Sequence, residues 1–332
     1  MSTTVEERAG RGTDAGADAP AGPVTLPEAY RYCETLARGH YENFNVGGWI
    51  TPRDKLPHVY AIYAWCRMVD DLGDEVFPTE SAATPVDDGK LVDTVTTYRR
   101  GKLAWWEEEL DAIYSGQPQH PISIAVQHTV GSFDIPREPF QRLIQANLMD
   151  QGSGRFDTLD DVLEYCRYSA NPVGHLYLYL FGCADRRRLL LADHTCTALQ
   201  LTNFWQDVSR DYRDRGRVYL PQNDMKRFGA SESDIANNAA TPGFRALLRY
   251  ECDIAMEMFR QGAALVESLD RRAQLPVALF TRGGVSVLHA IRRQGYDVLS
   301  HRPALSSRQK GWLLASAWLG NKLGIGYGLP KA

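Results

Sequence analysis

Residues 59–75 read VYAIYAWCRMVDDLGDE, and their order of apolar and acidic residues indicates a buried helix. If this stretch is helical, its polar side chains fall within an arc of roughly 100° on one face. These side chains are Tyr63, Arg67, Asp70, Asp71 and Asp74. Acids four residues apart usually mark a solvated face, but Trp65, Met68 and Val69 make the rest of this helix apolar. A helix that is apolar nearly all round is buried, so the acids are predicted to point into an interior cleft.

A second acidic stripe occurs at residues 200–211, which read QLTNFWQDVSRD. Its polar side chains share a helix arc of roughly 80°. They are Gln200, Asn203, Asp207 and Asp211. Large apolar neighbours such as Phe204 and Trp205 again place the helix inside the protein. We therefore predict two buried acidic stripes that face a common cleft.

The predicted cleft concentrates negative charge and oxygen ligands. Two like charges about 6 Å apart repel by about 3 kcal/mol at an effective dielectric of 20. A divalent cation relieves this repulsion, and the carboxylates with the amides of Gln200 and Asn203 form an all-oxygen set that suits Mg²⁺. Because Mg²⁺ commonly bridges carboxylates and substrate phosphates, we predict a diphosphate bound through magnesium. The implied chemistry is stabilisation of a departing diphosphate, which leaves a carbocation behind.

Aromatic side chains near these motifs suit a carbocation, because their π faces stabilise positive charge and are weak nucleophiles. The candidates include Tyr41, Phe44, Tyr63, Tyr168 and Tyr219. Core packing is the alternative role for each of them taken alone.

Helical periodicity runs through most of the chain, and strand-like alternation is nearly absent. The expected helices span 27–39, 54–75, 89–114, 120–131, 137–151, 158–181, 187–211, 244–270, 274–299 and 306–321. Dense turn chemistry separates them at 78–89, 115–121 and 228–243. Residues 25–325 are therefore predicted to form one all-α domain. Residues 1–24 are expected to be a disordered tail, and residues 326–332 a short C-terminal tail.

Composition excludes several function classes. The net charge of -4 and the scattered basic residues give no reason to expect nucleic-acid binding. The six cysteines and eight histidines show no zinc-ligand spacing, and burial in a reducing cytoplasm explains the cysteines. The sequence contains no run of 18 apolar residues, so a membrane-spanning helix is not expected. We expect a cytoplasmic protein.

Four motifs resemble those of squalene and phytoene synthases. D-D-x-x-D-E at 70–75 follows Y-A-W-C-R, and Q-x-x-N-x-x-x-D-x-x-x-D spans 200–211. R-V-Y-L-P at 217–221 and I-R-x-x-G-Y-D-V-L at 291–299 resemble further signatures of that family. The resemblance covers roughly residues 27–320. It implies the helical class I isoprenoid-synthase fold with a central cavity, and Mg²⁺ as cofactor.

Three stretches resemble the bacterial hydroxysqualene synthase branch of this family: HYENFNV at 40–46, SANPVG at 169–174 and NFWQD at 203–207. Related presqualene diphosphate and phytoene synthases usually carry a Gly-Thr-Val-Gly type sequence at 171–174, and an Arg where Gln206 stands. The branch resemblance implies that presqualene diphosphate loses diphosphate and that its cyclopropylcarbinyl cation rearranges. Water then captures the cation to give hydroxysqualene, without a hydride donor, in squalene and hopanoid biosynthesis.

The resemblance also implies roles for single residues. The magnesium ligands would be Asp70, Asp74, Asn203, Asp207 and Asp211. Arg67 and Gln200 would contact the diphosphate, while Tyr296 and Arg302 would close over it. Pro172 is expected to break the helix at Asn171, and we predict that the Asn171 amide helps to position the quenching water. A kink that only shapes the pocket is the alternative.

Other readings of the chain stay open. A presqualene diphosphate, squalene or phytoene synthase would instead condense two prenyl diphosphates, such as farnesyl diphosphate, head to head. A non-catalytic helical scaffold descended from such an enzyme generally loses motif aspartates, which this chain keeps. A lipid carrier explains an apolar cavity but not acids at its mouth. Peripheral membrane contact and contact with pathway enzymes suit a C30 substrate that partitions into lipid, although no basic amphipathic helix stands out.

Overall fold

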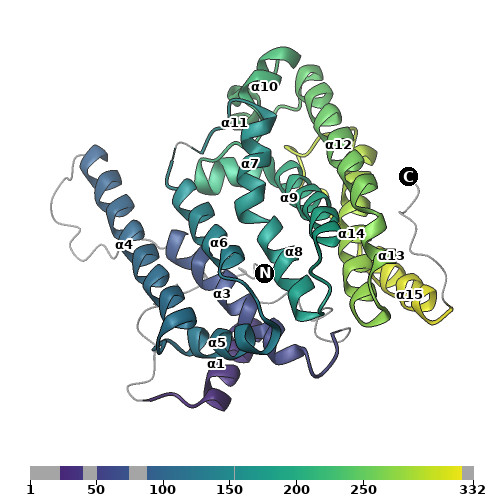
Figure 1. Ribbon diagram of the computed structural model, residues 1–332. Helices are drawn as coiled ribbons and strands as arrows, with labels where there is room; N and C mark the ends of the chain where they lie inside the picture. The colour runs from purple at the N-terminus through teal and green to yellow at the C-terminus, as the bar shows by residue number, and fades with distance from the viewer. Residues whose placement is uncertain (1–22, 40–50, 75–87, 153, 324–332) are drawn as a thin grey trace, which may run out of the picture.

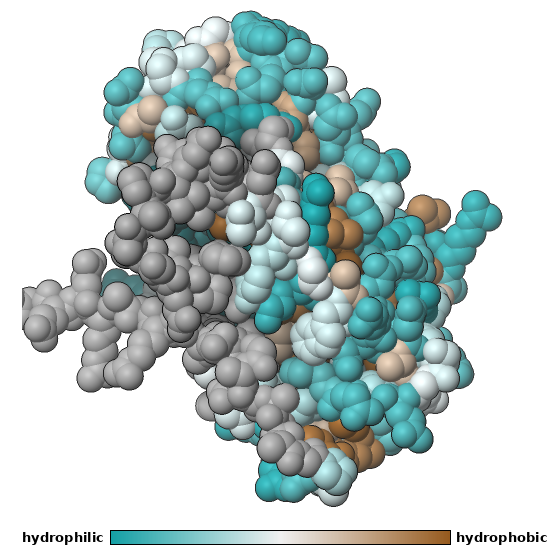
Figure 2. Space-filling view, turned by 90° about the vertical axis from the view of Figure 1, so that its left-hand side faces the viewer, coloured by the Kyte–Doolittle hydropathy of each residue, from teal (hydrophilic) through white to brown (hydrophobic). Residues whose placement is uncertain are grey.

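The computed structural model describes residues 23–39, 51–74, 88–152 and 154–323. Within these ranges the chain forms helices joined by loops, with one isolated parallel bridge between Arg155 and Val218. The all-α prediction is therefore confirmed. Hydrophilic residues cover most of the described surface on the face shown in Figure 2, with smaller hydrophobic patches between them. No described helix is long and apolar enough to cross a membrane.

The N-terminal half of the molecule packs around α3 (Leu56–Asp74), the helix of the first acidic stripe. Its neighbours are α1 (Leu26–Gly39), α4 (Asp88–Ser115), α5 (Pro121–Phe133), α6 (Glu138–Met149) and α8 (Asn171–Leu180). The indole rings of Trp65 and Trp106 stack at 4.5 Å, and Phe140 meets Trp65 edge-on at 5.4 Å. All three side chains are fully buried. As predicted, α3 lies inside the protein.

The C-terminal half packs around α9 (Arg186–Arg215), the helix of the second acidic stripe (Figure 1). Its neighbours are α7 (Leu159–Ser169), α8, α11 (Glu232–Ala236), α12 (Pro242–Gly262), α13 (Ala264–Ser268) and α14 (Arg271–Arg293). Two outer helices complete this half: α10 (Gln222–Phe228) on α12 and α15 (Ser307–Leu323) on α14. Trp205, Phe244 and Phe259 are fully buried in its core. Burial of α9 is therefore confirmed as well.

The predicted helix over 158–181 is interrupted beside Pro172 as expected, but the break falls at Ala170 and not at Asn171. Thr158 starts α7 with a capping box, in which its side chain and that of Asp161 each accept the other's backbone N–H. Ala170, with φ −114°, separates α7 from α8. Pro172 lies in the first turn of α8, where its missing N–H removes no helical hydrogen bond.

Other predicted boundaries are wrong. The helix expected over 274–299 ends at Arg293, because Gly295 (φ 61°) and Tyr296 (φ 60°) both adopt left-handed backbone. The segment expected over 244–270 is two helices, α12 and α13. α10 was not predicted, and α11 lies inside the predicted break at 228–243. With 7 and 5 residues, these two helices are too short to show a clear helical period.

Candidate active site

A pocket of about 460 Å³ lies between α3 and α9, and α6, α7 and the segment after α9 complete its wall. Its lining residues are Arg67, Asp70, Asp71, Asp74, Leu143, Ala146, Asn147, Asp150, Tyr165, Ser169, Gln200, Asn203, Phe204, Asp207, Asp211, Arg215, Arg217 and Tyr219. The two acidic stripes, more than 120 residues apart in the chain, therefore face one space.

The first stripe is held by arginines and by α6. Arg67 pairs with Asp71, one turn along α3, with a closest N–O distance of 2.5 Å. Asp74 pairs with Arg215 at 3.1 Å and with Arg217 at 3.4 Å, so the end of α3 is bound to the end of α9 and to the chain that follows it. The Asp70 carboxylate accepts a hydrogen bond from Asn147 of α6 at 3.3 Å.

The second stripe contributes Gln200, Asn203, Asp207 and Asp211 to the same pocket. They lie on one face of α9 because the helix continues without interruption to Arg215, where Gly216 ends it in left-handed backbone. Asp207 is bound by Arg302, which approaches from the turn after α14.

Negative charge exceeds positive charge in this pocket. Six carboxylates line it against three guanidiniums, which leaves an excess of three negative charges among the described lining residues. Asp70 is reached by water through the pocket, but the protein around it removes much of the solvation of its carboxylate. The negative charge of Asp74 also disfavours ionisation of Asp70. These causes raise the pKa of Asp70 to about 6 against the opposing Asn147 hydrogen bond. Burial and the neighbouring Asp207 raise the pKa of Asp211 to about 6 as well.

The profile of the squalene/phytoene synthase family matches residues 37–309. The chain belongs to this family. Family members act on prenyl diphosphates and generally use divalent metal ions. The resemblance expected from the four motifs is thereby confirmed, and the all-α architecture is that of the isoprenoid synthases.

Three similar proteins illustrate the range within the family. A solved structure of squalene synthase HpnC from Alicyclobacillus acidocaldarius is 42% identical, with a TM-score of 0.73, covering 83% of this chain and 97% of that one. The 15-cis-phytoene synthase of Synechocystis sp. is 29% identical over 310 residues, which are 89% of this chain and 86% of the relative. A dehydrosqualene synthase structure shares the fold at 24% identity and a TM-score of 0.76, covering 90% and 98%.

The sequence did not predict that Asp150, with its partners Tyr165 and Arg217, forms part of the site. Tyr165 donates to Asp150 at 2.9 Å, and Arg217 pairs with Asp150 at 3.4 Å. Burial raises the pKa of Asp150 and outweighs the attraction of Arg217. The sequence did single out R-V-Y-L-P, which contains Arg217 and Tyr219, but gave no sign of Asp150 as their neighbour.

The sequence predicted a helix at the position of α6 but not its contacts with the first acidic stripe. Besides binding Asp70, Asn147 lies so close to Gly73 that a Cβ there would stand 2.3 Å from its Oδ1. Gln151 donates from just beyond α6 to the Gly73 carbonyl at 3.0 Å. Asn147 and Gln151, four residues apart, are the one sequence signal that could have shown this polar face.

The remaining predicted residues lie in different places. Tyr219 lines the pocket and stacks on Phe204, with ring centroids 3.7 Å apart. Tyr168 and Tyr296 are half-buried against the core around α9 and do not line the pocket. Asn171 is buried, and its Oδ1 accepts from Thr197 at 3.0 Å. Tyr41 and Phe44 lie outside the described residues.

Tyr63 lines an apolar cavity instead. This cavity, of about 160 Å³, is also lined by Ile62 and Cys66 of α3. A second apolar cavity of about 190 Å³ lies between α8, α9 and α14. The two cavities share Val173, Tyr177 and Phe280, so apolar space continues beside α8.

The pocket fits a divalent ion in charge and in donor type, since its acids and amides are oxygen ligands in a region of negative excess. In the described part of the chain, no three His, Cys, Asp or Glu side chains already converge on one metal position. Such a site suits Mg²⁺, which is usually bound by one or two carboxylates together with substrate phosphates.

Proposed function

We propose that this chain converts presqualene diphosphate to hydroxysqualene in a Mg²⁺-dependent reaction, as a step of squalene and hopanoid biosynthesis. The acid-lined pocket with its excess of negative charge is the observation that carries the proposal, because it suits a metal-bound diphosphate. The 42% identity to squalene synthase HpnC, against 29% to the Synechocystis phytoene synthase, favours this reaction within the family.

The polar end of the site would hold the leaving group. Asp70, Asp74, Asn203, Asp207 and Asp211 would ligate the metal, which when bound supplies Lewis-acid stabilisation of the departing diphosphate. Arg67 and Gln200, both in the pocket wall, would donate to diphosphate oxygens, and Arg302 would join them from the turn after α14.

The apolar cavities would enclose the hydrocarbon and protect the cation. The bond from carbon to the diphosphate oxygen breaks, both electrons leave with diphosphate, and the cyclopropylcarbinyl cation rearranges. Aromatic faces, including Tyr63 in the cavity and Tyr219 in the pocket, stabilise the positive charge. A water oxygen then bonds to the cation and loses a proton, so the products are hydroxysqualene, diphosphate and a proton.

The proposal includes the predicted role of Asn171, whose amide would help to position the water that captures the cation. Its bond to Thr197 fixes the first turn of α8, two residues before Val173, which lines both apolar cavities. The amide would therefore act on the water through the wall it shapes, as well as through any direct contact.

Product analysis tests the reaction. The chain is incubated with presqualene diphosphate and Mg²⁺, without NADPH, and the products are separated by mass. We expect hydroxysqualene, lost with EDTA and with Asp207→Asn, and retained with Asp253→Asn at an exposed position of α12. Parallel incubations use farnesyl and geranylgeranyl diphosphate. A C30 product from farnesyl diphosphate alone, or phytoene from geranylgeranyl diphosphate, would instead establish the head-to-head condensation of the sister enzymes.

We also propose that the protein is cytoplasmic and touches the membrane surface through α15. Trp312 is 65% exposed there, beside the exposed Arg308 and Lys310. After Asp297 the chain has five Lys or Arg residues and no Asp or Glu, although its net charge is -4. An aromatic side chain with basic neighbours suits an anionic lipid surface. Sedimentation with phosphatidylglycerol vesicles should fall with Trp312→Ser, and equal binding to neutral vesicles would contradict the electrostatic part.

A further inference from the structure

The turn after α14 places Arg302 directly on Asp207. The Nε of Arg302 donates to Asp207 Oδ1 at 2.5 Å, and its Nη2 donates to Oδ2 at 2.8 Å. One guanidinium therefore engages both oxygens of a predicted metal ligand in a bidentate pair. The Arg302 side chain is 48% exposed and that of Asp207 17%, so the guanidinium approaches from the solvent side.

Gln206, the residue before Asp207, binds the same turn. Its Oε1 accepts from Arg302 Nη2 at 3.1 Å, and its Nε2 donates to the backbone carbonyl of Pro303. Gln206 is 6% exposed within α9, so its amide is held by the surrounding core. Both ends of the amide are engaged, and a side chain of similar size without an amide would lose both contacts.

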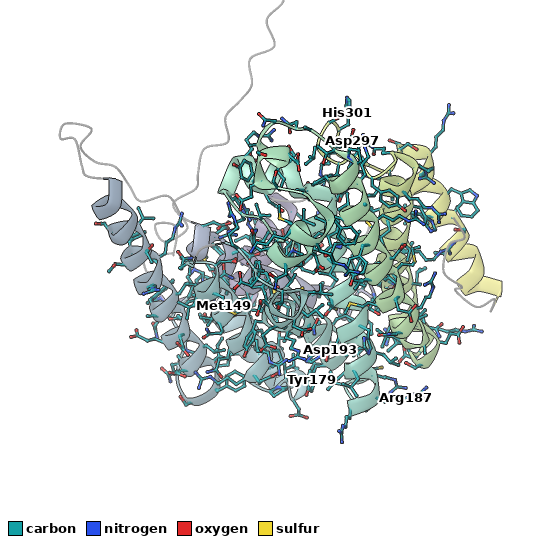
Figure 3. The ribbon with its side chains drawn as sticks, turned by 90° about the horizontal axis from the view of Figure 1, so that it is seen from above. Met149, Tyr179, Arg187, Asp193, Asp297 and His301 are labelled. Carbon is teal, nitrogen blue, oxygen red and sulfur yellow. The ribbon has the colours of Figure 1, made fainter. Side chains whose placement is uncertain are left out.

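The turn is also fixed at its other end. Asp297 accepts the Ser300 backbone N–H at 3.0 Å and pairs with Arg245 of α12 at 2.9 Å. Gln294 donates to the His301 carbonyl at 3.1 Å. Figure 3 shows Asp297 and His301 close together at one edge of the molecule. We call this turn, residues 294–303, the arm. These contacts hold it in place, and Gln206 attaches its far end to α9, the helix of the second acidic stripe.

We propose that Gln206 is a positioning residue that keeps Arg302 at the pocket, where the guanidinium covers Asp207 until a metal-bound diphosphate takes its place. The inference rests on the proposed function in one respect, the binding of Mg²⁺ and a diphosphate beside α9. While both Asp207 oxygens accept from Arg302, the guanidinium charge lies directly against the carboxylate, so a metal ion must compete with it for this ligand. When the guanidinium leaves Asp207, the Pro303 contact with Gln206 holds the arm within reach of a diphosphate oxygen.

Calorimetry on the full chain tests the exchange without any turnover. Two titrations are made, MgCl₂ alone and inorganic pyrophosphate in saturating Mg²⁺, on wild type, Gln206→Met, Arg302→Gln and the double variant. Arg249→Gln, at an exposed arginine of α12, is the matched control. We expect Arg302→Gln to tighten binding of Mg²⁺ alone several-fold, because Asp207 is uncovered. The same variant should weaken pyrophosphate binding about tenfold or more, since a hydrogen bond from a charged donor is lost.

The double variant separates positioning from mere packing. If Gln206 acts through Arg302, Gln206→Met weakens pyrophosphate binding in wild type but adds nothing in the Arg302→Gln background. Equal losses in both backgrounds, or unchanged Mg²⁺ binding in Arg302→Gln, would overturn the inference. A wild-type chain that binds no pyrophosphate with Mg²⁺ would refute the proposed function itself. Circular dichroism and the melting temperature check that each variant is folded. Gln206→Asn should bind pyrophosphate as weakly as Gln206→Met, because the shorter amide cannot span both contacts.

Discussion

Glu251 carries the sharpest prediction for stability. It lies on α12, is fully buried, and neither of its carboxylate oxygens has a hydrogen-bond partner among the described residues. Burial raises the pKa of Glu251 to about 8, and the Asp224 charge adds to the shift. The folded protein therefore keeps a proton that the unfolded chain releases near pH 4.5. Between these values the folded state binds more protons than the unfolded state, so stability falls as the pH rises.

The size of the effect follows from the proton count. One extra proton in the folded state lowers the free energy of unfolding by about 1.4 kcal/mol per pH unit. Between pH 6 and pH 8 the loss is about 2 kcal/mol, since the slope lessens as the folded carboxyl begins to ionise. For a chain of 332 residues this corresponds to about 3 °C in melting temperature.

Thermal or urea unfolding at pH 6, 7 and 8 measures this slope. Other carboxyls and histidines also titrate, so the informative quantity is the difference between wild type and Glu251→Gln, in which the proton is replaced by a permanent neutral group. Glu257→Gln, an exchange at an exposed residue of the same helix that pairs with Arg260, is the control. Wild type should lose about 2 kcal/mol relative to Glu251→Gln over this range. Parallel curves for the two proteins would show that Glu251 does not keep its proton.

Three further predictions concern the site. Asp74→Asn should lower hydroxysqualene formation at least about 100-fold, because loss of a proposed metal ligand should exceed the roughly 10- to 100-fold effect that is typical of outer-shell partners. Rates measured across a Mg²⁺ series check this. Gly73→Ala should lower the free energy of unfolding by about 1–3 kcal/mol, since its Cβ would collide with Asn147, and Gly101→Ala, with open space around its Cβ, serves as the control in urea unfolding. Asn171→Ala should lower the hydroxysqualene fraction by freeing Thr197, and a product mixture identical to wild type would remove Asn171 from the water step.

Much of the site could be predicted because each acidic stripe is a local pattern. The position of Asp70 relative to Trp65, or of Asp207 relative to Trp205, depends only on the helical period, and burial of the tryptophans reveals which face is inside. The helix break beside Pro172 was equally local, although it falls at Ala170, one residue before the predicted position. The all-α architecture follows from the same periodicity over nearly the whole chain.

What the sequence could not provide are contacts between distant segments. Asn147 reaches Asp70 across 77 positions, and Arg302 reaches Asp207 across 95. No period links such pairs. Their geometry depends on how α6 packs against α3 and on where the chain turns after Arg293, and that turn results from left-handed backbone at Tyr296, an uncommon conformation for a residue other than glycine.

The arginines show why this distinction matters for function. Arg67 and Arg210 both lie within the two motifs, but only Arg67 pairs with an acid of its own stripe, Asp71. In the structure Arg210 pairs with Asp214 instead, while Asp74 and Asp207 are bound by Arg217 and Arg302 from outside the two stripes. Asp71 has its partner on its own helix, but the contacts of Arg217 and Arg302 come from other segments, so we expect a metal to replace these two without disturbing either motif helix. In the proposed reaction the acids attract the cation, and the arginines that the fold brings to the pocket determine what it must displace.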